Sequence, residues 1–296
     1  MLKLLRVVFK IVSLILLISL ILFAVSYLTG YKVYRNVGYG EGEQNVMDIF
    51  MPNEAKLKDL NGCVLFIHGG SWSGGDKWEE EARCRLLASR GYITVTMNYT
   101  LISEDNADFY TVFSVLDEID SALSVTVSFA AERGITIDKA ATAGYSAGAH
   151  LAMLYAYSRA DSAPVEIMFT SSMAGPSDIS PEVWGDDLSA RIGTILTGED
   201  VSVDMLDDNN VKELLKSISP VSYITSDSVP TAIIQGGMDT TVSPANADSL
   251  IKHLSDSSVP YDYVHLKDSD HSLLQNPVLH LSYYGLLLDY CHIYFD

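Results

Sequence analysis

Short apolar runs alternate with amphipathic stretches over most of this 296-residue chain, and this alternation restricts the fold more than any other feature. Seven runs have the length and apolar content of strands: 46–51, 63–67, 93–97, 140–144, 165–169, 231–234 and 261–266. Helical patterns lie among them at 77–90, 110–133, 147–159, 244–255 and 277–290. Strands that alternate with helices of this length predict βαβ units, and therefore a mostly parallel sheet with helices on both faces.

Segment 175–218 interrupts this alternation. It contains two prolines, Trp184 and many acidic residues, and it is too long for a plain connection between strands. We expect it to be an insertion that forms a cap over the C-terminal edge of the sheet. Its acidic residues lack the spacing and central glycine of an EF-hand loop, so they predict a solvated acidic surface rather than a Ca²⁺ site.

The first thirty residues have the pattern of a membrane anchor. Lys3, Arg6 and Lys10 precede an uncharged apolar run at 11–28, which as a helix would span about 27 Å. Basic residues on one side predict a cytoplasmic N-terminus and an extracytoplasmic remainder. We therefore expect a transmembrane helix within residues 1–30, followed by one domain at 31–296. The alternative is a signal peptide cleaved near Ala24-Val25-Ser26, which would make the domain secreted.

Charge and cysteine content exclude several classes of protein. The 19 basic and 38 acidic residues give a net charge of −19, which argues against nucleic acid as a partner. Without the three basic residues of the N-terminal segment the net charge is −22, so anionic lipid headgroups should repel the domain. Three cysteines are too few for a disulfide scaffold, and they lack the paired close spacing of a zinc site. Free thiols are expected, with a Cys63–Cys84 bridge as the alternative.

A G-x-S-x-G sequence at 144–148 supplies a candidate nucleophile, Ser146. A strand-like run of small residues precedes it and a helical run follows it. A sharp turn between a strand and a helix exposes a serine at the edge of the sheet, and this arrangement is the nucleophile elbow of α/β-hydrolases. A Gly-rich turn with an incidental serine is the alternative, and the flanking strand and helix argue against it.

The sequence His68-Gly69-Gly70-Ser71-Trp72 directly follows the strand predicted at 63–67. A hydrolase of this kind needs backbone N–H groups that point at the oxyanion formed during the reaction. One such group comes from the residue after the nucleophile, here Ala147, and the others come from a Gly-rich loop. Gly70 and Ser71 are the expected donors, and Gly69 allows the backbone to turn.

A catalytic acid and a histidine should follow the serine in that order. Asp239 lies just after the strand predicted at 231–234, and His271 follows the strand predicted at 261–266. His271 is expected to remove the proton from Ser146, while Asp239 orients and stabilises the imidazole. Asp268 and Asp270 are rival acids, but they neighbour His271 in sequence instead of ending an earlier strand.

With these residues, the chain resembles the α/β-hydrolase superfamily over about residues 43–290, in particular its hormone-sensitive-lipase-like and bacterial carbohydrate-esterase-like members. Segment 47–52 is similar to their LDVYLP strand, and 68–77 resembles their HGGGW…GDK loop. Segments 98–101, 144–152, 219–221 and 236–243 are similar to NYRL, GxSAGGHLA, SP-[IV] and GxxDxxVP. Ser71, Thr100 and Ala149 depart from these patterns; Ser71 also occurs in arylformamidase-like and prenylcysteine-methylesterase-like members.

The resemblance implies an α/β-hydrolase fold with a cap insertion and a serine esterase acting on a small-molecule ester. Short-chain acyl esters are the expected substrates, including acetyl or feruloyl esters of carbohydrates, and no metal or organic cofactor is implied. Trp72, Tyr145 and Trp184 are candidate substrate-binding residues. A peptidase or amidase, including an arylformamidase-like enzyme, is the first alternative, and a non-catalytic extracellular binding module is the second. The natural substrate and the oligomeric state stay open.

Overall fold

The computed structural model describes residues 2–53, 62–103, 106 and 109–295. In this part of the chain, eight strands form a sheet in the order β1-β2-β4-β3-β5-β6-β7-β8. β2 is antiparallel to β1 and β4, and the other neighbouring strands are parallel. The strands are β1 (Tyr31–Gly38), β2 (Val46–Pro52), β3 (Gly62–Ile67), β4 (Ile93–Met97), β5 (Lys139–Tyr145), β6 (Glu166–Met173), β7 (Thr231–Gly236) and β8 (Tyr261–Leu266). The predicted mostly parallel sheet is confirmed.

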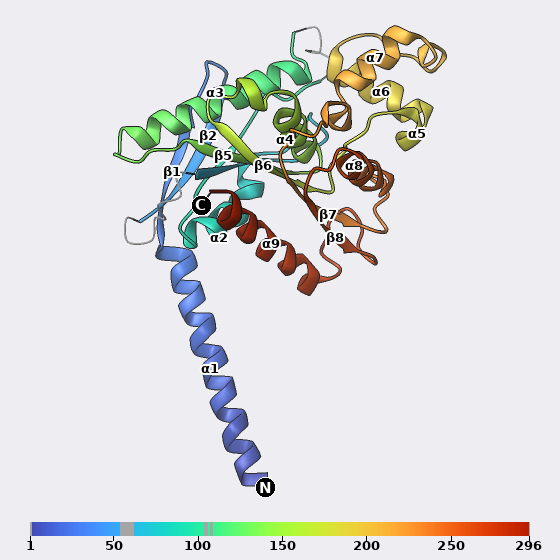
Figure 1. Cartoon of the computed structure of the whole chain (residues 1–296). Helices are drawn as coiled ribbons and strands as arrows, with labels where there is room; N and C mark the ends of the chain where they lie inside the picture. Colours follow the sequence, from blue (N-terminus) through green and yellow to red (C-terminus); the bar gives the residue numbers. More distant parts are fainter. Residues whose placement is uncertain (1, 54–61, 104–105, 107–108, 296) are drawn as a thin grey trace.

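Helices cover both faces of the sheet (Figure 1). The side chains of β3 pack alternately into the hydrophobic core on one face and the core on the other. Leu65 and Ile67 pack with residues of α3 and α4, while Val64 and Phe66 pack with residues of α2 and α9. Because both faces are covered, β3 is a continuous apolar run without alternation. The helices are α2 (Glu81–Ser89, after the 3₁₀ turn η1, Lys77–Glu80), α3 (Val112–Ala131), α4 (Ala147–Ser158), α8 (Ala245–Asp256) and α9 (Pro277–Phe295).

The first strand, β1, is absent from the sequence prediction. It lies at the edge of the described sheet and pairs with β2, with an irregular register between Tyr34 and Val37. Most of its side chains are partly or fully exposed, so its sequence carries little apolar signal. The three cysteines, Cys63, Cys84 and Cys291, are buried and form no disulfide bond. The alternative Cys63–Cys84 bridge is therefore not found.

Residues 175–218, which we call the cap, lie between β6 and β7. They form α5 (Pro181–Trp184), α6 (Asp186–Thr197), the 3₁₀ turn η3 (Val203–Met205) and α7 (Asn209–Ser217), and a second turn, η4 (Pro220–Tyr223), leads back to the sheet. α6 ends at Gly198 in the left-handed conformation, φ 74°. α6 and α7 approach closely at Gly193, where a Cβ would lie 2.9 Å from Leu215. The cap projects from one end of the domain in Figure 1.

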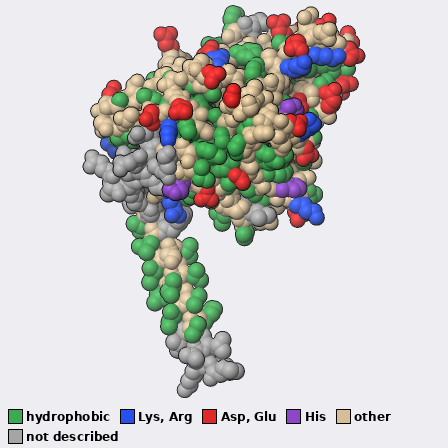
Figure 2. Space-filling view, in the orientation of Figure 1, with side chains coloured by type: hydrophobic (Ala, Val, Ile, Leu, Met, Phe, Trp, Pro, Cys, Tyr) green, Lys and Arg blue, Asp and Glu red, His purple; other side chains and the backbone are tan. Residues whose placement is uncertain are grey.

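At the N-terminus, α1 (Leu2–Thr29) is a single helix that extends away from the sheet (Figure 1). Its described side chains, those of residues 8–22 and 25, are exposed and almost all apolar, as Figure 2 shows. Within the part of the chain described, no helix is long and apolar enough to cross a membrane, so the predicted transmembrane helix is not found.

Candidate active site

Ser146 lies in the turn between β5 and α4 with φ 54° and ψ −122°, a conformation that non-glycine residues rarely adopt. The turn closes tightly because its flanking residues are glycines. A Cβ on Gly144 would lie 2.3 Å from the Gly148 carbonyl carbon, and a Cβ on Gly148 would lie 2.0 Å from the Ile67 carbonyl oxygen. The structure thus has the elbow geometry predicted from the motif, with the start of α4 pressed against the end of β3.

The three residues predicted as a triad come together from three separate strand ends. The Ser146 Oγ is 3.0 Å from the His271 Nε2. The opposite ring nitrogen, Nδ1, is 2.7 Å from the Asp239 Oδ2. Asp239 is 4% exposed and follows β7, while His271 follows β8. Of the rival acids, Asp270 bonds Ser272 instead of the imidazole.

Asp239 is held by more donors than the sequence pattern indicated. Its Oδ1 accepts the N–H groups of Thr241 and Val242, both at 2.9 Å. Its Oδ2 accepts the Gln235 side-chain amide at 3.0 Å in addition to His271. Gln235 is buried at the end of β7 and also donates to the Val242 carbonyl. Sequence reasoning missed Gln235, although its place four residues before Asp239 on a buried strand was a signal.

Tyr145 differs from the expectation that it contacts substrate. It is not among the residues that line the cavity beside Ser146. Its hydroxyl donates to the His271 carbonyl oxygen at 2.7 Å, and its ring lies 5.1 Å from the imidazole, centroid to centroid. Burial is the main cause that raises the pKa of Tyr145 to about 12, so the hydroxyl keeps its proton and remains a donor. Its contacts fit a residue that positions His271.

The loop after β3 has the backbone that an oxyanion site needs. Gly70, Ser71 and Trp72 have φ values of 108°, 52° and 60°. The N–H groups of Gly70, Ser71 and Ala147 have no acceptor among the described residues. Ser71 and Ala147 line the cavity with Ser146, whereas Gly69 and Gly70 do not. Gly69 instead lies against the nucleophile, where a Cβ would be 3.2 Å from the Ser146 Cβ.

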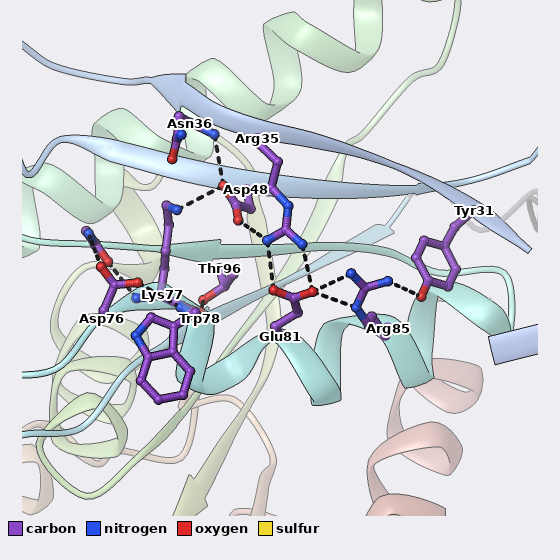
Figure 3. Close-up of polar contacts among 11 residues, drawn as sticks. Tyr31, Arg35, Asn36, Asp48, Asp76, Lys77, Trp78, Glu81, Arg85 and Thr96 are labelled. Atoms are coloured by element: carbon purple, nitrogen blue, oxygen red, sulfur yellow. Dashed lines mark hydrogen bonds and ion pairs between the residues drawn. The ribbon is translucent and has the colours of Figure 1, made fainter. Parts of the chain in front are cut away.

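A polar network anchors the far end of this loop to the sheet (Figure 3). The Lys77 N–H donates to the Asn98 side chain at 2.6 Å, and its carbonyl accepts the Thr96 hydroxyl at 2.8 Å. The Lys77 ammonium lies 3.1 Å from Asp48 on β2, and Arg35 of β1 bridges Asp48 and Glu81. The Asp76-Lys77 pair of the GDK motif therefore holds this end of the loop against the sheet.

His150 connects the same loop to the cap. It is buried in α4, its Nδ1 lies 3.2 Å from the Trp72 Nε1, and its Nε2 lies 2.7 Å from the Ile218 carbonyl oxygen. Because the indole can only donate and the carbonyl can only accept, His150 is neutral with its proton on Nε2. Burial lowers the pKa of His150 to about 4.

This pKa predicts a loss of stability in acid. Between about pH 6.5 and pH 4, the histidine is protonated in the unfolded chain, where its pKa is about 6.5, but stays neutral in the folded protein. The contribution of neutral His150 to the free energy of unfolding is therefore fully present above about pH 6.5 and is lost as the pH falls towards 4. At pH 5 the contribution lost is about 2 kcal/mol. Urea titrations at pH 7 and pH 5 should show that much more loss in the wild type than in His150→Gln. Equal losses in the two proteins would contradict this assignment.

The cavity beside Ser146 has a volume of about 260 Å³ and lies between the two loops and the cap. Trp72 and Trp184 both line it, as predicted, and the Trp184 indole donates to the Asp178 carbonyl at 2.8 Å. Apart from Arg191, the lining side chains are uncharged: Ser71, Trp72, Ser73, Ser146, Ala147, Pro176, Trp184, Leu188, Ile192, Ile195, Thr241 and Val242. Within the described residues, no group of three His, Cys, Asp or Glu side chains is placed to hold a metal ion.

Solved structures share this fold at low sequence identity. A truncated carbohydrate esterase from gut microbiota superposes with a TM-score of 0.75 at 17% identity, covering 90% of this chain and 98% of the other. Esterase B from Lactobacillus rhamnosis superposes with a TM-score of 0.70 at 20% identity, covering 96% and 94%.

Comparison with known sequences finds a shorter matched segment at higher sequence identity, and it also identifies a matching protein family. Kynurenine formamidase from Salmo salar is 31% identical over 119 residues, which is 40% of this chain. The matched part spans 37% of the formamidase and about a third or less of the next two curated relatives. The family model described as BD-FAE matches residues 47–254, which include the elbow, the oxyanion loop and Asp239. The chain belongs to the BD-FAE family of α/β-hydrolases.

Proposed function

We propose that this chain is a serine hydrolase that cleaves short-chain acyl esters, including acetyl or feruloyl esters of carbohydrates. The observation that carries the proposal is the continuous hydrogen-bonded chain from Ser146 through His271 to Asp239, which opens into a small cavity. The two similar solved structures are those of esterases, which points the same way. That activity is a property of those proteins, and the substrate proposed here rests on the site of this chain.

The geometry supports an acyl-enzyme mechanism in two steps. His271 accepts the Ser146 proton as the Oγ attacks the ester carbonyl, and the N–H groups of Ala147 and Ser71 stabilise the oxyanion. The imidazolium, paired with buried Asp239, then gives the proton to the leaving alcohol. Water enters, His271 activates it, and the acyl group leaves as a carboxylic acid.

The experiment that tests the proposal is hydrolysis of p-nitrophenyl esters by the full-length protein. We expect acetate and butyrate to be cleaved with kcat/KM at least about tenfold above octanoate. A cavity of about 260 Å³ is below the usual range of volumes for ligand sites. Methylene groups of a long acyl chain that stay outside the cavity gain none of the ~0.8 kcal/mol of binding free energy that burying each one would supply. A preference for octanoate would contradict this assignment of the acyl site.

An amidase is the second candidate, because the similarity to a formamidase reaches 31% identity. The same acyl-enzyme route serves a formamide or a peptide bond, and only the leaving group differs. Parallel assays with an aryl formamide and with a peptide anilide decide between the two. Turnover of either amide with a kcat/KM above that of p-nitrophenyl acetate would favour the amidase. Complete inactivity on esters and amides would favour a non-catalytic binding module.

We further propose that the N-terminal segment holds the domain outside the cytoplasm, as an anchor or, if cleaved, as a secretion signal. Its support is the basic flank of Lys3, Arg6 and Lys10 before an apolar run. Fractionation of the producing cells after alkaline washing tests this. Recovery of the full-length protein in the cytosol would exclude both forms.

A further inference from the structure

One charged side chain, that of Arg191, lines the cavity beside Ser146. The other described lining residues are apolar or carry hydroxyl groups. Arg191 comes from α6, where it lies between Leu188 and Ile192 on the face that the helix turns toward the cavity. Positions 188, 191, 192 and 195 have the i, i+3, i+4, i+7 spacing of one helix face. The arginine therefore occupies an apolar stripe that points at the reacting centre.

Arg191 has no partner among the residues that the structure describes. Its guanidinium makes no hydrogen bond or ion pair with any residue in the described part of the chain. Asp187 stands four residues before it, where helical ion pairs commonly form, yet no ion pair joins the two. Other arginines on the surface are paired; for example, Arg159 lies 2.6 Å from Asp117. The five donors of Arg191 are thus free for a ligand.

Four acidic side chains of the cap line a different cavity, of about 520 Å³, together with two lysines: Asp178, Glu182, Asp186, Asp207, Lys212 and Lys216. Figure 2 shows acidic side chains beside Lys and Arg side chains on the visible surface at the end of the molecule where the cap lies. The catalytic cavity thus has a local cation in a protein of net charge −19. The net charge of the protein repels an anionic substrate, whereas Arg191, the one charged residue among the described lining of the catalytic cavity, attracts an anion there.

We propose that Arg191 is a specificity-determining residue that binds a carboxylate on the substrate. The substrate class is an ester whose acyl or alcohol part carries a carboxylate a short distance from the scissile bond. A guanidinium pairs with a carboxylate through two parallel N–H···O bonds, and this geometry fixes orientation as well as charge. The inference rests on the proposed esterase function, because it names the substrates of that same site.

Two matched pairs of esters test the proposal and tell the acyl side from the alcohol side. For the acyl side, p-nitrophenyl hemisuccinate is compared with p-nitrophenyl butyrate. For the alcohol side, para-acetoxybenzoate is compared with para-acetoxybenzamide. We expect one anionic ester to exceed its neutral partner in kcat/KM, and Arg191→Gln to lower that ratio about ten- to hundredfold, mainly through KM. Arg191→Lys should fall between the two, because it keeps the charge and loses the fork.

Lys212→Gln is the matched control, because it removes the same charge from the cap at the other cavity. It should leave both ratios within about twofold of the wild type, the size expected for a distant surface charge. The proposal is overturned if the wild type prefers the neutral ester of both pairs. It is equally overturned if Arg191→Gln leaves the ratios unchanged, or if Lys212→Gln lowers them as far as Arg191→Gln does.

Binding to a protein without its nucleophile separates this inference from the esterase proposal. Calorimetric titration of the Ser146→Ala variant measures affinity without turnover. The ligands are the same two pairs: p-nitrophenyl hemisuccinate with p-nitrophenyl butyrate, and para-acetoxybenzoate with para-acetoxybenzamide. We expect one anionic ester to bind about tenfold or more tightly than its neutral partner, and the preference to disappear in Ser146→Ala/Arg191→Gln. An anion preference in an inactive protein would retain the carboxylate site and reject the esterase. Turnover without any anion preference would do the reverse.

Discussion

Replacing Ser146 with alanine is expected to lower kcat/KM for p-nitrophenyl butyrate by about four orders of magnitude or more. Among the described residues, the Ser146 Oγ is the one nucleophilic atom that lies both against the His271 Nε2, at 3.0 Å, and in the cavity. Without it, no acyl-enzyme forms, and only the oxyanion donors and the binding cavity remain to accelerate attack by water. Initial-rate measurements with purified wild type and variant give the ratio directly.

The variant should remain folded. The described contacts of the Ser146 side chain include a hydrogen bond to His271. Removing the hydroxyl group breaks that bond and leaves no buried charge without a partner. The melting temperature should therefore change by only a few degrees, the usual range for a surface-accessible substitution of this size. A variant that keeps more than about a hundredth of the wild-type rate while melting normally would mean that another group is the nucleophile.

Replacing Asp239 with asparagine is expected to lower kcat by about three to four orders of magnitude. Both Asp239 oxygens accept hydrogen bonds: Oδ1 from the N–H groups of Thr241 and Val242, and Oδ2 from Gln235 and His271. An asparagine has one oxygen, so its amide N–H₂ must face donors on one side. Facing His271, it would favour the tautomer that carries the proton on Nε2, and that tautomer cannot accept the Ser146 proton.

Asp270→Asn is the control for this experiment, because it changes the same type of residue next to His271. The Asp270 carboxylate is exposed and accepts bonds from Ser272. Its replacement should alter kcat by no more than about twofold, as expected for an exposed carboxylate outside the catalytic hydrogen-bond chain. Steady-state kinetics with p-nitrophenyl butyrate measure both variants. If Asp270→Asn were the more damaging of the two, the acid would have to be reassigned.

The central strands and the three candidate catalytic residues could be predicted from the sequence because the patterns that mark them lie within short segments of the chain. β3 is buried on both faces and is a short continuous apolar run, and β4, which is also buried throughout, alternates apolar residues with threonines. Ser146 stands between a strand and a helix, and Asp239 and His271 follow strands of one parallel sheet. The carboxyl ends of parallel strands meet at one edge, so strand ends predict proximity.

Features that depend on side-chain contacts across the fold could not be predicted. The edge strand β1 lacks an apolar pattern because much of it faces solvent. Tyr145 is the last residue of β5, and its sequence position suggests contact with substrate, yet its hydroxyl reaches His271, 126 residues away in sequence. Arg191 looks in sequence like any surface cation of a helix, and only the packing of the cap places it in the cavity.

The most direct test of the account is covalent trapping of the nucleophile by diisopropyl fluorophosphate, followed by mass spectrometry of proteolytic fragments. A phosphonylating or phosphorylating reagent of this kind reacts with a serine that a neighbouring histidine activates. If Ser146 is the activated nucleophile, one equivalent of label attaches to Ser146, and esterase activity is lost in proportion to labelling. The His271→Ala variant takes up no label under the same conditions. Label on a different residue, or full activity after complete labelling of Ser146, would show that Ser146 is not the nucleophile.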